Sequence, residues 1–110
     1  MHEFGLAEGV LAAVRRRAGG RPVRRVRLRA GVRHGVDADS MAQAFRFVAA
    51  GTEAEGAGLD LVTLPVHLAC RSCGYTGDTV DVLSACPQCH ADDVELTGGD
   101  ELVLESLEYR

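Results

Sequence analysis

Four cysteines form two C-x2-C pairs, Cys70 with Cys73 and Cys86 with Cys89, and twelve residues separate the pairs. The chain has no other cysteine. A tetrahedral zinc ion takes four thiolates at about 2.3 Å, and two short turns that face each other can supply them. We therefore predict a closed structural zinc site, in which no coordination position is left for chemistry.

Two alternatives compete for the same cysteines. Two disulfides would need an oxidising compartment, and we recognise no secretory signal in the sequence. The second alternative is a rubredoxin-like iron site, because C-x-x-C-G and C-P-x-C segments also occur around iron in such proteins. The spacing favours zinc and leaves iron open.

The segment Met1-His2-Glu3 could bind a second metal. A free α-amine has an unperturbed pKa of about 7.7–8.0 and can act as a nitrogen ligand near neutrality. The amine of Met1, the backbone nitrogen and imidazole of His2, and the backbone nitrogen of Glu3 could surround one ion. Nickel(II) and copper(II) favour such tetragonal nitrogen sites. On its own a histidine at position 2 is a weak signal, since most have no metal role.

Composition and charge argue against several classes of function. The chain has 110 residues and a formal net charge of −4, with sixteen acidic side chains against twelve arginines and no lysine. An acidic total opposes nucleic-acid binding, for which a basic surface is expected. No apolar run approaches the length of a membrane span, so we expect a soluble, cytoplasmic protein. We find no catalytic constellation and no glycine-rich phosphate loop, so we expect no enzyme.

Apolar periodicity and turn residues predict the elements that must position these groups. Residues 23–31 alternate between apolar side chains and arginines, which is typical of a strand with one buried and one solvated face. We read the row Arg25, Arg27 and Arg29 mainly as that solvated face, with a nucleic-acid or partner surface as the alternative. In chain order we expect a helix over 3–18, a strand over 23–31, a loop over 31–39, a helix over 38–50 capped by Asp37 or Asp39, a strand over 59–70 that leaves the main sheet near Pro65, and a strand over 101–109.

This order predicts an α+β fold, in which two helices pack on a small mixed β-sheet and a four-cysteine zinc-ribbon module is inserted. We place the α/β domain at residues 1–66 and 98–110 and the zinc module at residues 67–97. Gly98-Gly99 reads as a hinge between them. A hinge beside an inserted module is compatible with a monomer or with a weak, domain-swapped dimer.

Several stretches together resemble the HypA/HybF family of hydrogenase maturation nickel chaperones. They are MHEFGLAEGVL at the start, RVRLRAG followed by GVDADSMAQAF, GTEAEGAGLDL, and CRSCG, CPQC and GDELVLESLE toward the end. The similarity therefore spans essentially the whole chain. The combination of an M-H-E start, an inserted four-cysteine module and a returning G-D-E-L strand is specific to this family.

The resemblance implies a nickel metallochaperone that works with a HypB-type GTPase to supply the large-subunit precursor of nickel–iron hydrogenase. It implies nickel binding by Met1, His2 and Glu3, with Asp37 as a possible accessory acid. The zinc ligands would be the four cysteines. The alternative function is a zinc-ribbon module that binds nucleic acid or another protein.

The remaining histidines receive structural interpretations. His34 lies in a loop where many family members carry a G-E-L-S-G pattern, and we read it as a solvated side chain. His90 directly follows the second C-x2-C pair, and it is a possible accessory ligand or a hydrogen-bonding neighbour of the bound sulfurs. His67 falls in a predicted strand, where we expect it to be structural.

Overall fold

The computed structural model describes residues 2–82 and 85–110, which divide into two compact units. The first unit comprises Met1–Arg29, Val36–Val62 and Val103–Arg110, and the second comprises Ala30–Gly35 and Thr63–Leu102. The domain boundaries expected from the sequence, at 66/67 and 97/98, stay a prediction. None of the helices in the described part of the chain is long and apolar enough to cross a membrane.

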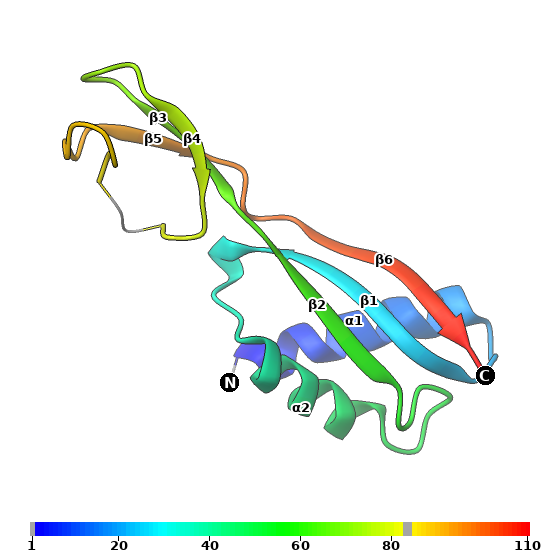
Figure 1. The fold of residues 1–110 in the computed structure, drawn as a ribbon. Helices are drawn as coiled ribbons and strands as arrows, with labels where there is room; N and C mark the ends of the chain where they lie inside the picture. The colour runs from blue at the N-terminus through cyan, green and yellow to red at the C-terminus, as the bar shows by residue number, and fades with distance from the viewer. Residues whose placement is uncertain (1, 83–84) are drawn as a thin grey trace. The chain divides into compact units, whose positions relative to one another are not determined.

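The first unit packs two helices on one face of a three-stranded sheet (Figure 1). The helices are α1 (His2–Ala18) and α2 (Ala38–Ala49), and the strand order is β2 (Gly58–Leu64), β1 (Val23–Gly31), β6 (Leu102–Tyr109). In Figure 1, β2 runs in the same direction as β1, whereas β6 runs in the opposite direction. The sheet is therefore mixed, and the α+β prediction with its helices and returning strand is confirmed.

Helix α1 forms because its apolar residues recur at helical spacing. Ala7, Val10, Val14 and Ala18 are all buried, and they lie three or four residues apart. An acidic residue in the first turn and three arginines in the last turn complement the helix dipole. Gly19 ends the helix with a left-handed φ of 59°.

Helix α2 starts at a side-chain cap. The Asp37 carboxylate accepts hydrogen bonds from the Ser40 backbone N–H at 3.0 Å and from the Ser40 hydroxyl at 3.1 Å. This satisfies a donor that has no partner within the helix. The sequence left Asp37 and Asp39 as candidate capping residues, and Asp37 is the cap in the structure.

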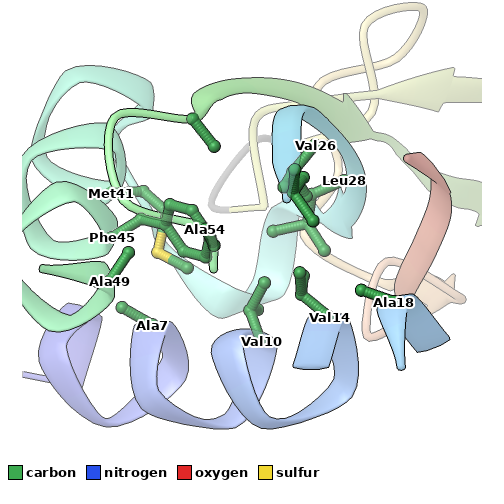
Figure 2. Packing of buried hydrophobic residues seen from close by; sticks show 12 residues of the cluster. Ala7, Val10, Val14, Ala18, Val26, Leu28, Met41, Phe45, Ala49 and Ala54 are labelled. Atoms are coloured by element: carbon green, nitrogen blue, oxygen red, sulfur yellow. The ribbon is translucent and has the colours of Figure 1, made fainter. Parts of the chain in front are cut away.

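The apolar core of the first unit lies between the helices and the sheet. Figure 2 shows Met41 and Phe45 of α2 reaching toward Val10 of α1, with Val26 and Leu28 of β1 beside them. All five are buried. Among the described buried residues of this core Phe45 is the only aromatic one, and the partly buried Tyr109 of β6 packs against the core.

The C-terminal residue closes this unit. The Arg110 backbone N–H donates to the Pro22 carbonyl at 3.0 Å, and its guanidinium donates to the carbonyls of Val23 and Glu55. The Arg21 guanidinium lies 3.8 Å from the centroid of the Tyr109 ring. The end of β6 is thereby tied to the start of β1.

The second unit contains a small antiparallel sheet with strand order β4, β3, β5. Strand β3 (Val66–Cys70) pairs with β4 (Thr76–Thr79) and with β5 (Val94–Thr97), so that Leu68 faces Gly77 on one side and Leu96 on the other. Pro65 separates β2 from β3, as predicted. The expected loop over 31–39 contains a short 3-10 turn, η1 (Val32–His34), which is closed by Gly35 in the left-handed conformation.

The Gly98-Gly99 segment is engaged by the residues around η1. The Gly31 N–H donates to the Glu101 carbonyl at 2.7 Å, and the Arg33 N–H donates to the Gly99 carbonyl at 2.8 Å. The Arg33 guanidinium also donates to the Leu96 carbonyl at 3.0 Å. The segment expected as a hinge is thus hydrogen-bonded within the second unit.

Candidate metal centre

The four cysteine sulfurs of the second unit lie together. All four Sγ atoms fall within 4.8 Å of one another. The distance is 3.6 Å from Cys70 to Cys89 and also 3.6 Å from Cys73 to Cys86. A disulfide would require about 2.05 Å, so these sulfurs are not bonded in pairs. A tetrahedral ion with sulfur bonds of about 2.3 Å places its sulfurs about 3.8 Å apart, which the arrangement fits.

The two cysteine turns have the same backbone pattern. In the first, the Gly74 N–H donates to the Cys70 carbonyl, and in the second the His90 N–H donates to the Cys86 carbonyl, at 3.0 and 2.8 Å. Gly74 has a φ of 82° and His90 a φ of 64°. His90 therefore occupies the position that glycine takes in the first turn.

Backbone N–H groups point at the sulfurs. Cys73 donates to the sulfur of Cys70 at 3.4 Å, and Gln88 and Cys89 donate to the sulfur of Cys86 at 3.4 and 3.5 Å. Such donors stabilise thiolate charge, as metal-bound cysteines require. The Gln88 side-chain amide adds a contact to Cys73 at 3.6 Å.

The four close thiols differ in pKa, which is lowered at Cys70 and Cys86 and raised at Cys73 and Cys89. The Cys73 N–H lowers the pKa of Cys70 to about 7. At Cys73 the N–H of Tyr75 favours the thiolate, but burial and the neighbouring sulfurs outweigh it and raise the pKa to about 12. A dication held by all four sulfurs would remove this mutual repulsion. The donor set therefore fits a soft divalent metal, and the described metal-ligating group contains the four predicted cysteines.

The predicted nickel residues lie at the start of α1. Met1 is outside the described residues. His2 begins the helix, its side chain is 57% exposed, and its Nδ1 atom lies 3.7 Å from Oε2 of Glu3. The pKa of the Glu3 carboxyl is lowered, first because its own backbone N–H donates to it. Asp37 is engaged in capping α2.

The other two histidines take part in local contacts. His34 Nε2 lies 3.0 Å from the Asp100 carbonyl, so its ring is held and not simply solvated. His67 is exposed on β3, where Nδ1 lies 3.0 Å from the Asp78 carboxylate on the paired strand. The structural interpretation of His67 agrees with this cross-strand contact.

An aromatic surface near the N-terminus is not apparent from the residue patterns of the sequence. Phe4 of α1 and Phe47 of α2 make an edge-to-face contact with ring centroids 5.2 Å apart, and Phe47 is 72% exposed. Beside them lies a cavity of about 320 Å³. Its described lining is Glu3, Phe4, Ser40, Gln43, Ala44 and Phe47. The one sign of this surface in the sequence is Phe47, a large aromatic residue that lies outside the apolar face formed by Met41, Phe45 and Ala49 of the same helix.

The arginine row of β1 is matched by carboxylates. Arg25 pairs with Asp60 of β2 at 3.2 Å, and Arg29 pairs with Glu105 of β6 at 3.0 Å. Arg27 shares Glu105 at 3.6 Å. The row is exposed, as expected, but it is not an uncompensated positive stripe. This removes the one feature that supported nucleic-acid binding.

Comparison with known proteins identifies relatives along the whole chain. A family model described as "Hydrogenase/urease nickel incorporation, metallochaperone, hypA" matches residues 1–109. The hydrogenase maturation factor HypA of Rhodobacter capsulatus is 37% identical over 111 residues, which cover 98% of each chain. That of Alkalilimnicola ehrlichii is 38% identical over 111 residues, with the same coverage.

A solved structure agrees with these relatives. The fold is similar to the solution structure of the Ni metallochaperone HypA from Helicobacter pylori, with a TM-score of 0.62 and 26% identity over 97% of this chain and 96% of that chain. Family match, relatives and structure point the same way. The chain belongs to the HypA family of hydrogenase maturation nickel metallochaperones, which are not enzymes.

Proposed function

We propose that the chain binds nickel(II) at its N-terminus and helps to insert it into the large-subunit precursor of nickel–iron hydrogenase. The ligands would be the amine of Met1, the backbone nitrogen and imidazole of His2, and the backbone nitrogen of Glu3. The observation that carries this proposal is the match of residues 1–109 to a nickel-incorporation family, combined with the M-H-E start.

The start of α1 is suited to this role. The first backbone N–H groups of a helix have no acceptor within the helix. Because α1 begins at His2, the nitrogens of His2 and Glu3 can bind a metal without breaking a helical hydrogen bond. The exposed imidazole of His2 leaves the ion accessible to a partner.

We propose that the four cysteines hold zinc in a structural role. All four protein ligands would be used, so the ion would have no open position for catalysis. Cys70 ends β3, and the second cysteine turn follows the first by twelve intervening residues. The metal therefore joins distant parts of the second unit. Iron would satisfy the same geometry, and elemental analysis separates the two.

The aromatic surface of Phe4 and Phe47 supports a docking role for the first unit. An exposed aromatic residue beside a cavity is typical of protein contact surfaces. Its neighbour Glu3 is also a proposed nickel ligand. We therefore place the contact with a HypB-type GTPase at this surface, in the cytoplasm. Any energy-dependent step would come from that partner.

Calorimetric titration of untagged protein with nickel(II) tests the site. We expect one nickel per chain in the wild type, and loss of this binding in His2→Ala and in a variant with one glycine added before Met1. His67→Ala is the matched control, because His67 is also an exposed histidine. Nickel binding of wild-type affinity in either N-terminal variant would refute the assignment.

A further inference from the structure

The two cysteine turns differ in how they are attached to the second unit. The first turn, residues 70–74, follows β3 directly, because Cys70 is the last residue of that strand. β3 is the central strand of the small sheet, with β4 on one side and β5 on the other. The second turn, residues 86–90, comes between β4 and β5 in the chain and belongs to no strand. Only the first turn therefore continues a paired strand.

Backbone hydrogen bonds fix the first turn to the residues that precede both outer strands. The Cys70 N–H donates to the Tyr75 carbonyl at 2.8 Å, just before β4. The Arg71 N–H donates to the Asp93 carbonyl at 2.9 Å, just before β5. Cys70 is also paired with Val94 between β3 and β5. The first turn is thus attached to the sheet by contacts that involve no sulfur.

The side chain of Arg71 adds a further connection to β5. Its guanidinium donates from one nitrogen to the Asp93 carboxylate at 3.0 Å and from another to the Glu95 carboxylate at 3.3 Å. An arginine can bridge two carboxylates because its N–H groups form a rigid planar fork. All three side chains are more than half exposed, so each ion pair alone contributes little. Their effect adds to that of the backbone hydrogen bond at the same residue.

The second turn lacks such an attachment. Its backbone hydrogen bonds close it on itself and reach no strand. Within the described residues, the segment 85–91 makes hydrogen bonds and ion pairs to the rest of the chain only through sulfur. The Gln88 side-chain amide donates to the Cys73 sulfur, and sulfurs of the two turns contact each other. The groups that a metal would bind are therefore the ones that connect this turn to its surroundings.

The space beside the second turn is incompletely filled. A cavity of about 300 Å³ is lined by Ala85 and Pro87 of this segment and by residues of the small sheet and the turn before β4, among them Leu68 and Tyr75. Burial does not distinguish the turns, because each contains one buried and one exposed cysteine. The difference between them lies in their attachment to the sheet.

We propose that Arg71 is a positioning residue, which fixes the first cysteine pair on the sheet and leaves Cys86 and Cys89 as the pair that opens first. In the open state Cys70 and Cys73 would keep the ion, and water would take the two vacated positions. Local opening starts where a segment has the fewest contacts. The inference rests on the proposed zinc site, and it adds a direction to metal exchange that the sulfur distances alone do not show.

Amide hydrogen exchange of the zinc-loaded chain tests the proposal without a chelator. The N–H groups of Gly74 and His90 occupy matching positions, since each donates to the carbonyl of the first cysteine in its own turn. After correction for intrinsic rates, we expect the His90 amide to exchange about tenfold faster than the Gly74 amide, because only the second turn opens readily. Equal exchange, or faster exchange at Gly74, would overturn the proposal.

Brief alkylation of the zinc-loaded chain with N-ethylmaleimide reports the same opening at the sulfurs. The reaction is limited so that most chains stay unlabelled, and mass spectrometry locates the first label. Sulfurs of like exposure are compared, Cys89 with Cys73 and Cys86 with Cys70, each relative to its rate in the denatured chain. We expect each second-turn cysteine to be labelled about tenfold faster than its counterpart. Equal rates would contradict the proposed direction.

Two variants test the part played by Arg71. Arg71→Gln and Arg33→Gln each remove one arginine that donates to a residue of β5, but only Arg71 lies in a cysteine turn. We expect Arg71→Gln to lower the ratio of Cys89 to Cys73 labelling about threefold, the size of effect that exposed ion pairs produce. Arg33→Gln should leave this ratio unchanged. A mere loss of stability would raise labelling at all four cysteines together, and that result for Arg71→Gln would refute the positioning role.

Zinc analysis of the wild type separates this inference from the site on which it rests. A chain that takes up no zinc would refute the zinc assignment and this inference with it. A chain that holds one zinc and opens equally at both turns would refute only the direction of opening. Because no nickel is added in any arm, the results do not depend on whether the N-terminal site exists.

Discussion

Gly31 and Gly99 lie in direct backbone contact. A Cβ atom added to Gly31 would overlap the carbonyl group of Gly99. The φ of Gly31 is −64°, which any residue adopts, so its glycine is required by its neighbour and not by its own conformation. The contact is reinforced by the hydrogen bonds that join residues 31–34 to residues 96–101.

We expect Gly31→Ala to lower the free energy of unfolding by about 3 kcal/mol, because backbone atoms cannot move aside as a side chain can. Urea unfolding measures this. Gly9→Ala is the control: it lies inside α1 with no atom within 4 Å of the added Cβ, so it should stabilise the protein by about 0.5–1 kcal/mol. An unchanged free energy of unfolding in Gly31→Ala would show that residues 31–34 and 96–101 can move apart.

Asp37→Ala should destabilise the protein by about 1 kcal/mol, because α2 loses its side-chain cap. Asp37→Asn keeps a capping oxygen and should change stability by only a few tenths of a kcal/mol. Thermal unfolding with nickel titration on the same samples distinguishes two roles for this acid. We expect nickel affinity to stay within twofold in Asp37→Asn, and a larger loss would assign it an accessory part in nickel binding.

Replacing His90 by glycine should stabilise the second unit by about 1 kcal/mol, since a residue with a Cβ atom is strained at a φ of 64°. His90→Ala keeps the Cβ atom and should show no gain. Zinc content after dialysis against a competing chelator provides the second measurement. If His90→Gly loses zinc faster than wild type, the imidazole contributes to the metal centre.

Removal of the thiolate-bound metal should unfold the second unit and leave the first unit folded. The first unit has its own buried core, whereas the second depends on the joined cysteine turns. Amide NMR spectra with and without a strong chelator should lose dispersion for residues 66–97 and keep it for α1 and α2. Cys73→Ser should give the same spectrum as the chelator-treated wild type. A second unit that stays fully folded after chelation would contradict the structural role proposed for the metal.

Nickel affinity should fall as pH falls, because protons compete with the metal for the amine, imidazole and amide nitrogens. Each proton released on binding makes the dissociation constant about tenfold larger per unit decrease in pH. Competition titrations between about pH 7.5 and pH 6 measure the slope, and zinc content should stay constant over this range. A flat profile would exclude nitrogen ligands that must lose protons.

Local signals in the sequence were sufficient for most of the fold. The apolar stripes of residues 3–18 and 38–50 and the alternation of residues 23–31 predicted three elements whose observed ends differ by one residue or less. The cysteine spacing predicted the metal cluster, because two C-x2-C turns have few other ways to place four sulfurs together. In each case the determining residues are close in sequence.

Contacts between residues that are far apart in the sequence could not be predicted from local patterns. Gly98-Gly99 suggested a hinge, and only the fold reveals that Gly31 and Arg33 bind this segment. The arginine row of β1 gave no indication that Asp60 and Glu105 would neutralise it, since both acids come from other strands. The short turn at residues 32–34 likewise depends on its partners near residue 100.

The shared backbone pattern of the two cysteine turns has a consequence for metal exchange. Each turn closes through its own backbone hydrogen bond, at Gly74 and at His90, so each half of the cage is formed by residues that are close in sequence. A bound ion would then be the link that joins the two turns. We therefore expect metal to exchange in two stages, with the two sulfurs of one turn released before those of the other.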